Sequence, residues 1–142
     1  RASKLLIIRS PETYEQYGTI VTSFLNFNLI WNEGIAFGLF SFDEKLYYNF
    51  LTIFICLITA VIIWLMFRSS GFEKLSYIMI IGGSFGNVFD RIFYSAVPDF
   101  IDIHFNNFHW FIFNVADIFV TLGIFCLIGI EIFSKKINEN YK

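Results

Sequence analysis

One aspartate lies inside a stretch of sequence that is apolar enough to cross a bilayer. Residues 110–133 read WFIFNVADIFVTLGIFCLIGIEIF, and Asp117 falls within this run, with Asn114 three residues before it. A carboxylate at the centre of a membrane helix costs about 2.5–3.5 kcal/mol on insertion scales, so such a residue usually has a function or a partner. Finding that partner is the route to the function.

The carboxylates that could join it are Asp90, Asp99 and Asp102. Asp117 is expected about two helical turns inside its span, at the same side of the membrane as Asp90. Asp99 and Asp102 follow Pro98, in a loop expected to return towards the membrane. Two carboxylates close together in a poorly solvated place share one proton. Such a pair can act as general base to a water and general acid to a leaving amine, which is peptide hydrolysis without a metal or a covalent nucleophile. The spacing leaves open whether Asp99 or Asp102 is the partner.

Other hydrolytic chemistries have little support in the sequence. It contains no GxSxG, HExxH or P-loop motif. His104 and His109 could bind a metal with Asp102, but the segment HFNNFH lacks the i, i+4 spacing of a helical zinc pair. We therefore interpret both histidines as residues of an interfacial loop.

A stripe of small and polar residues follows one expected membrane helix. Gly82, Gly86 and Asp90 are four apart and share a helical face, with Asn87 and Arg91 on neighbouring turns. The glycine spacing alone indicates close packing of two helices, and Asp90 and Arg91 alone could be an interfacial ion pair. Together the polar side chains favour the wall of a site.

The composition requires an apolar environment for much of the chain. Of its 142 residues, enough for one domain, 56% are hydrophobic and only 15% are charged. A soluble core of this size could not bury so much apolar surface, so lipid must surround part of it. The net charge is −2 and the ten Lys and Arg residues are dispersed, which argues against a nucleic-acid partner. Cys56 and Cys126 lie in apolar runs without metal or redox spacing, and we interpret them as buried apolar residues.

Three segments have the length and character of membrane helices: 46–67, 75–93 and 111–133. Arg68 and Lys74 flank the short loop between the first two, and the tail 134–142 also carries lysines. Because basic residues favour the cytoplasmic side, we place this loop and the tail in the cytoplasm and the carboxylates at the outer face.

The N-terminal third is expected to add two further pieces. Residues 1–10 hold a short apolar patch. Three spans with a cytoplasmic C-terminus leave the N-terminus outside, so we interpret this patch as the end of an N-terminal helix whose start is missing. Residues 11–44 contain SFLNFNLIWN, whose alternation is typical of a half-buried strand, and we expect a periplasmic β-element there. The whole chain, 1–142, then forms one integral membrane domain.

Three blocks of the sequence resemble the signature blocks of lipoprotein signal peptidase, also called signal peptidase II. They read NEGIAFG at 32–38, GGSFGNVFDRIFYSAVPDFIDIHF at 82–105 and FNVADIFVTLG at 113–123, in the expected order and spacing. With Ser3 and Lys4 near the start, the similarity covers nearly the whole chain. GxxxG or NxxD alone would be a weak signal, but the combination is specific.

The resemblance implies a fold and an activity. The family is a four-helix aspartic peptidase of the bacterial inner membrane with a small periplasmic β-cradle. We therefore expect a membrane all-α helical bundle with an extracytoplasmic β-cradle, with three spans in this chain and a fourth, N-terminal span missing. Family members remove the signal peptide from prolipoproteins, before the cysteine that carries a diacylglyceryl group, and no metal or cofactor is implied. The implied partners are lipid-modified prolipoprotein signal peptides and membrane lipids, and we expect a monomer.

By the same resemblance the catalytic pair is Asp99 and Asp117, which chooses Asp99 over Asp102. Asn114 is expected to hydrogen-bond this pair or the substrate backbone, and Arg91 to orient polar groups of the substrate. The positions matching those that line or support the family's substrate site are Asn32, Gly34, Asn87, Asp90, Arg91, Asn114 and Ala116.

The chain departs from the family pattern at two places. The first helix of the family usually ends in an aspartate a few residues before the lysine matched by Lys4, whereas this chain opens at Arg1. Ala96 stands where the family often has glycine, which is expected to alter the turn and not the chemistry.

Two other classes of protein compete with the peptidase. A proton-coupled transporter or channel subunit would use Asp117 and Asp90 as relay carboxylates, and a structural membrane protein would use Asp–Arg pairs to hold its helices together. The transporter predicts acidic residues near the midplane and symmetric halves. Here the carboxylates gather towards one face and the sequence has no internal repeat, so we favour the peptidase.

Overall fold

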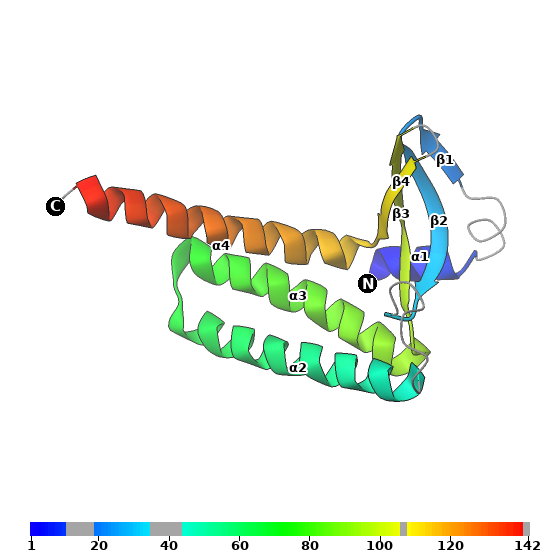
Figure 1. Cartoon of the computed structure of the whole chain (residues 1–142), viewed down its shortest axis with the longest axis horizontal. Helices are drawn as coiled ribbons and strands as arrows, with labels where there is room; N and C mark the ends of the chain where they lie inside the picture. The colour runs from blue at the N-terminus through cyan, green and yellow to red at the C-terminus, as the bar shows by residue number, and fades with distance from the viewer. Residues whose placement is uncertain (11–18, 35–43, 106–107, 141–142) are drawn as a thin grey trace.

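The protein combines three long helices with a four-stranded sheet at one end of them (Figure 1). This computed structural model describes residues 1–10, 19–34, 44–105 and 108–140. In chain order the elements are α1 (Ala2–Ile8), β1 (Thr19–Thr22), β2 (Leu25–Asn32), α2 (Glu44–Arg68), α3 (Gly71–Tyr94), β3 (Val97–Phe105), β4 (Phe108–Phe113) and α4 (Val115–Asn140). The middle helix, α3, contacts both α2 and α4.

The surfaces of the long helices are suited to lipid. Two segments of the described chain are long and apolar enough to cross a membrane, Tyr48–Arg68 in α2 and Val115–Ser134 in α4. Their side chains face outward, as Phe50 and Phe125 do at 67% and 66% exposure, and so much apolar area in water would be strongly unfavourable. The third expected span lies within α3, which is less apolar.

The two cysteines were interpreted wrongly as buried residues. Cys56 on α2 and Cys126 on α4 are free and exposed. An apolar sequence does not by itself indicate burial in a protein core, because a membrane helix carries apolar residues on its lipid-facing side as well.

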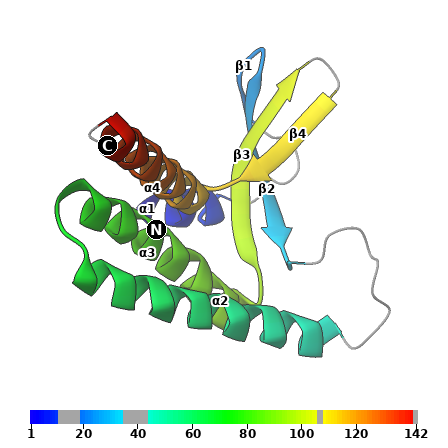
Figure 2. The ribbon, with the colours of Figure 1, turned by 60° about the vertical axis from the view of Figure 1, so that its left-hand side comes forward.

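The sheet has the order β1-β2-β3-β4, and every neighbouring pair is antiparallel. It rises from the end of the helical body, as Figure 2 shows. Its central pairing, β2 with β3, places Asn32 opposite Val97 and Leu25 opposite Ile103. The pairing shifts register between Phe27 and Ile30, an irregularity that lies opposite the segment containing Asp99. Such bulges change the direction of nearby side chains.

The sheet is larger than the sequence predicted. Within 11–44 the described strands are β1 and β2, while 11–18 and 35–43 lie outside the described residues. Residues 97–105 were expected in a loop and 111–113 in a helix, but these residues belong to β3 and β4, and α4 begins only at Val115. An apolar run such as FHWFIF does not distinguish a strand from a helix by itself, and pairing with β3 decides for the strand.

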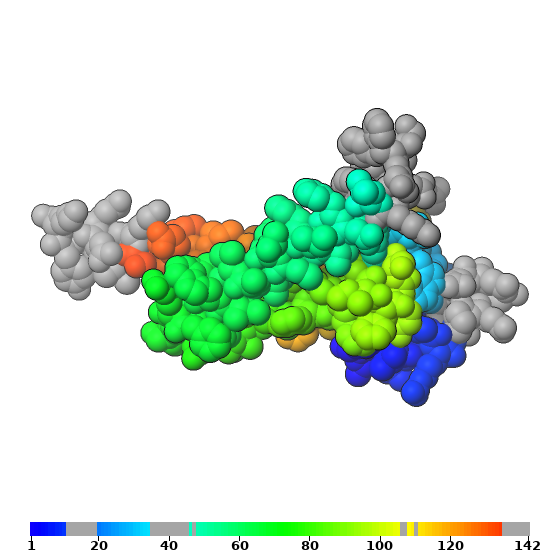
Figure 3. All heavy atoms as spheres, turned by 90° about the horizontal axis from the view of Figure 1, so that it is seen from below, coloured from blue at the N-terminus to red at the C-terminus, as the bar shows by residue number. Residues whose placement is uncertain are grey.

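A small core joins α1 to the sheet. Ile7 of α1, Leu29 of β2 and Phe100 of β3 are buried and pack together. On its other side α1 lies against the C-terminal part of α3, where the blue and yellow-green atoms meet in Figure 3. The N-terminal segment is thus held at the junction of sheet and helices.

Two glycines allow α3 and α4 to approach closely. A Cβ atom on Gly83 would collide with the backbone oxygen of Ala116 and with Val120, and one on Gly123 would lie 2.6 Å from Ile80 Cγ1. Of the stripe noted in the sequence, Gly82 has open space beside it and is not at this contact, which is made one residue later by Gly83. Gly86 would make only ordinary contact, 3.5 Å from the Cβ of Ala116.

This contrast gives a matched pair of substitutions. Gly83→Ala should lower the stability of the folded protein by about 1–3 kcal/mol, since an added methyl group must push the helices apart. Gly82→Ala should leave it unchanged or raise it by about 0.5–1 kcal/mol, because alanine is the better helix former and its methyl group meets nothing. Thermal unfolding of both variants in detergent measures the difference, and equal midpoints would contradict this view of the helix contact.

Candidate active site

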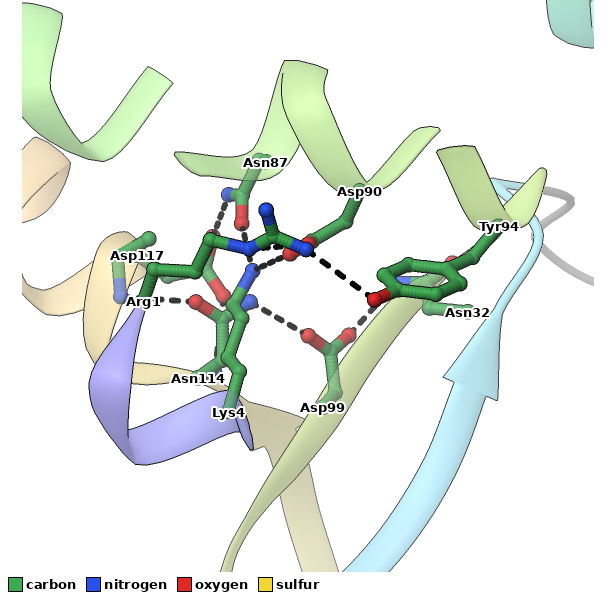
Figure 4. A network of polar contacts seen from close by, with 10 residues as sticks. Arg1, Lys4, Asn32, Asn87, Asp90, Tyr94, Asp99, Asn114 and Asp117 are labelled. Atoms are coloured by element: carbon green, nitrogen blue, oxygen red, sulfur yellow. Dashed lines mark hydrogen bonds and ion pairs between the residues drawn. The ribbon is translucent and has the colours of Figure 1, made fainter. Parts of the chain in front are cut away.

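Two aspartates from different elements meet at Asn114. Asp99 belongs to β3 and Asp117 to the first turn of α4. The side-chain amide of Asn114 donates to Asp99 Oδ1 at 2.6 Å, and its backbone N–H donates to Asp117 Oδ2 at 2.9 Å (Figure 4). Asn114 is fully buried and Asp99 is 4% exposed. One asparagine therefore fixes the position of both carboxylates.

The motif NVAD forms a capping box at the start of α4. Asn114 precedes the helix, and its side-chain oxygen accepts a hydrogen bond from the N–H of Ala116 at 2.8 Å. Asp117, three residues later, accepts the N–H of Asn114 in return. This reciprocal pattern satisfies two backbone donors that a helix start would otherwise leave unpaired, and a carboxylate is favoured there by the helix dipole. The capping role was missed from the sequence, although the signal, Asn-x-x-Asp before an apolar run, is visible in it.

The second oxygen of Asp99 is bound from the sheet. Asn32 Nδ2 donates to Asp99 Oδ2 at 2.9 Å, and Asn32 Oδ1 accepts the backbone N–H of Gly34 at 2.8 Å. Gly34 has φ +78°, a left-handed conformation that favours glycine, and a Cβ there would lie 2.8 Å from Leu51 Cδ2. The block beginning at Asn32 is therefore a turn that aims an amide at Asp99.

The second oxygen of Asp117 is bound from α3. Asn87 Nδ2 donates to Asp117 Oδ1 at 2.7 Å, while Asn87 Oδ1 accepts a hydrogen bond from Lys4 Nζ at 2.6 Å. Lys4 also contacts Asp90 Oδ2 at 2.5 Å, and both side chains are almost fully buried. A continuous polar network thus extends from Asp90 through Lys4, Asn87 and Asp117, as Figure 4 shows.

Two members of this network come from the N-terminal segment. Lys4 matched the family, but the sequence suggested no role for it, and Arg1 was not predicted at all. Arg1 Nε lies 3.6 Å from Asp90 Oδ1, its Nη2 donates to the Tyr94 hydroxyl at 3.2 Å, and its guanidinium lies over the Phe89 ring. A lone lysine within the apolar run KLLII was the available signal.

Two of the residues predicted to line the substrate site, Ala116 and Arg91, differ in whether they take part in the network. Ala116 takes part through its backbone and packs against α3. Arg91 does not join: its Nε atom is buried without a hydrogen-bond partner in the described part of the chain, and its backbone oxygen accepts the Tyr48 hydroxyl at 3.3 Å.

The structure separates Asp99 from Asp102. Asp102 is 1% exposed and is bound by His109 Nδ1, at 2.8 Å from Oδ2. Residues an odd number apart on a strand face opposite sides of a regular sheet. Of the two, Asp99 is therefore the one that shares Asn114 with Asp117. Neither histidine lies in a loop as predicted, because His104 is in β3 and His109 in β4.

The surroundings of Asp99 favour its protonated form. Burial raises the pKa of this carboxyl above its ordinary value, the hydrogen bonds from Asn114 and Asn32 oppose this rise, and the nearby charge of Asp117 adds to it. A carboxyl with a raised pKa beside a second carboxylate can hold and release a proton.

Two hollows adjoin the network. One, of about 350 Å³, opens at Asp99 and is lined by Ile30, Trp31, Asn32, Glu33 and Ile112 as well. The other, of about 330 Å³, lies between α1 and the α3–α4 pair, where Gly82, Gly83 and Ala116 line it. A chain could therefore approach the carboxylates from the sheet side or from the helix side.

The buried Lys4–Asp90 pair gives a stability test. Lys4→Met should destabilise the protein by about 3–5 kcal/mol, because it leaves the Asp90 carboxylate buried with only the more distant Arg1 nearby. Adding Asp90→Asn to Lys4→Met removes that uncompensated charge and should recover part of the loss. Thermal unfolding of the single and double variants measures this; a double variant less stable than the single one would contradict a compensating pair.

The comparisons with known proteins agree over most of the chain. Residues 1–133 match the family model for signal peptidase II. The chain is 52% identical over 141 residues to a lipoprotein signal peptidase of Pelagibacter ubique (strain HTCC1062), covering 98% of this chain and 85% of the relative. It is 40% identical over 120 residues to that of Francisella tularensis subsp. novicida (strain U112), covering 82% and 74%.

Solved structures give the same result for the fold. Two structures, each described as a bacterial membrane enzyme, superpose on this one with TM-scores of 0.71 and 0.72 at 25% sequence identity. They cover 99% and 89% of this chain, and 83% and 81% of their own. Together with the apolar helices they support a membrane location. The resemblance noted in the sequence is therefore confirmed, and the chain belongs to the signal peptidase II family of lipoprotein signal peptidases.

Proposed function

We propose that this lipoprotein signal peptidase is an aspartic endopeptidase in which Asp99 and Asp117 activate a water molecule. Its substrates are diacylglyceryl-modified prolipoproteins, cut before the lipidated cysteine. The observation that carries the proposal is that the buried Asn114 holds both carboxylates through two different N–H groups. No metal or other cofactor is needed for this chemistry.

The two carboxyls have different roles. Asp99, whose pKa is raised by burial, begins as the protonated acid, and Asp117 begins as the base. Asp117 takes a proton from water while the oxygen of that water attacks the scissile carbonyl carbon, and Asp99 gives its proton to the carbonyl oxygen. The carbon–nitrogen bond then breaks as Asp117 passes its proton to the leaving amine of the cysteine. The signal peptide leaves with a new carboxyl group, and its hydroxyl proton returns to Asp99.

The neighbouring residues position this pair. Asn32, held by the turn at Gly34, orients Asp99, and Asn87 orients Asp117. Asp90 acts on Asn87 through Lys4. The backbone of Ala116 and the side chain of Arg91 remain our candidates for contacts with the substrate.

The substrate is proposed to enter from the bilayer. The apolar signal helix would approach laterally, beside the hollow between α1 and the α3–α4 pair, while the lipid tails stay in the membrane. Arg68 and Lys74 lie at the opposite end of the helices from the network, so the positive-inside rule supports a periplasmic site in a multi-pass protein of the bacterial inner membrane. The enzyme is proposed to work as a monomer.

Replacing either aspartate tests the mechanism. Asp99→Asn and Asp117→Asn should each reduce cleavage of a lipidated precursor by at least about 100-fold, the usual contribution of a positioned acid or base. Glu73→Gln is the matched control, since this carboxylate begins α3 at the far end from the network. Activity is measured on purified protein with a diacylglyceryl-modified precursor, as the appearance of the shortened product. Near-normal cleavage by either aspartate variant would refute the dyad.

The pKa of Asp99 gives a pH test. Because the pKa is raised, Asp99 keeps its proton to a higher pH than a free aspartate, and activity should fall as pH rises through that raised value. The hydrogen bond from Asn32 lowers this pKa, so Asn32→Ala should move the alkaline fall of kcat/KM to higher pH. Glu33→Gln, in the same hollow, should leave the position of the fall unchanged. An alkaline fall that stays in place in Asn32→Ala would contradict Asp99 as the acid.

A further inference from the structure

A second polar cluster lies on the sheet, away from the proposed catalytic pair. It consists of Asp102, His104 and His109, whose potential ligand atoms all lie within 4.8 Å of one another. The chain has only two histidines, and both are in this cluster. The peptidase mechanism uses none of these three residues.

The strand pairing brings the three side chains together. His104 on β3 and His109 on β4 are direct partners in the sheet, and their rings stack with centroids 5.4 Å apart. Asp102 precedes His104 by two residues on the same strand, the spacing that returns to one face of a sheet. His109 Nδ1 lies 2.8 Å and 3.0 Å from the two oxygens of Asp102. The hairpin thus offers two imidazoles and one carboxylate to a common centre.

Two atoms beside this carboxylate lack a hydrogen-bond partner. Within the described residues, His104 Nδ1 and Asn26 Oδ1 are both buried and unpaired. Asn26 on β2 is the direct sheet partner of Asp102. A buried polar atom left unpaired costs about 1–3 kcal/mol. A protonated His109 would account for Asp102 but would leave both of these atoms unsatisfied.

We propose that Asp102, His104 and His109 bind a divalent transition-metal ion of the zinc class. Imidazole nitrogen and carboxylate oxygen are ligands that Zn²⁺ accepts, and no thiolate lies in the cluster to select a softer ion. Asn26, the sheet partner of Asp102, carries an unpaired oxygen, Oδ1, that would be a candidate further ligand. One cation bound here would neutralise the buried carboxylate of Asp102 and bring His104 a polar partner.

The site can close around an ion by moving side chains alone. Bonds of about 2.0–2.2 Å place neighbouring ligand atoms about 3.3–3.6 Å apart in a tetrahedral zinc site. The potential ligand atoms already lie within 4.8 Å of one another, and the His109 side chain is 53% exposed, so closure needs only small side-chain shifts. Because its ligands come from β3 and β4 and its flanking asparagine from β2, the ion would fasten three strands together. Its role is structural: it steadies the strand that carries Asp99.

Metal titration tests the proposal. Tag-free protein, stripped with EDTA and kept in detergent, is titrated with Zn²⁺ in a calorimeter and with Co²⁺ while visible absorption is recorded. We expect one ion per chain, the visible bands of nitrogen- and oxygen-bound Co²⁺, and a rise in the thermal unfolding midpoint on adding Zn²⁺. Wild-type protein that takes up no ion would overturn the proposal.

Substitutions then identify the ligands. His104→Ala and His109→Ala should each weaken Zn²⁺ binding by at least about tenfold, since even the loss of an outer-shell partner costs 10- to 100-fold. Phe111→Ala, an exposed change on the same strand as His109, should bind as the wild type does. Unchanged affinity in either histidine variant, or loss of binding in Phe111→Ala, would refute this ligand set.

Three further variants distinguish this site from Zn²⁺ binding at the thiols or at the proposed catalytic pair. Cys56→Ala and Cys126→Ala should bind Zn²⁺ normally, and loss of binding in either would move the site to the thiols. Asp99→Asn should also bind Zn²⁺ normally while failing to cleave a precursor, so the metal site and the proposed mechanism can fail independently. Loss of binding in Asp99→Asn would contradict a separate site.

Discussion

The arrangement at the end of the helices depends on the hydrogen bonds made by Asn114. Its backbone N–H, its side-chain N–H and its side-chain oxygen each bind a different partner, respectively Asp117, Asp99 and the first turn of α4. The group that begins the last membrane helix is therefore the group that ties this helix to the sheet. Because each of these polar groups of Asn114 has a hydrogen-bond partner, the residue can hold two acidic side chains close together in a poorly solvated site without leaving buried polar atoms unpaired.

The sequence predicted the parts of this site that depend on residue type and on family pattern. It identified Asp117 as a carboxylate whose insertion into a membrane helix costs free energy. The family pattern supplied Asn32, Asn87 and Asn114 as neighbours, and the structure brings all three to the network. The sequence could not choose between Asp99 and Asp102 from spacing alone. That choice depends on strand alternation, and β3 was taken for a loop although one of its partners, β4, follows it directly and only the other, β2, lies far away in the chain.

The remaining errors have a common physical origin in the membrane. An apolar run is compatible with a lipid-facing helix and also with a strand. The start of α4 was therefore placed four residues too early, at 111 instead of Val115. Cys56 and Cys126 looked buried for the same reason, although both are exposed on helices that are apolar enough to cross a membrane. Conversely, Lys4 is 2% exposed and neutralises Asp90 inside the protein; the apolar run after Lys4 signals its burial, but nothing near it in the sequence identifies the partner.

The span of the polar network along the chain also governs when the site can exist. Lys4 and Asp90, its direct partner, are separated by 86 positions, and Asp117 enters only with the final helix. Until the ribosome has delivered α4, the network therefore lacks Asp117. If Asp117 is catalytic as proposed, hydrolytic competence arises only after α4 has partitioned into the bilayer, and a half-finished molecule cannot cut its neighbours at the translocation channel.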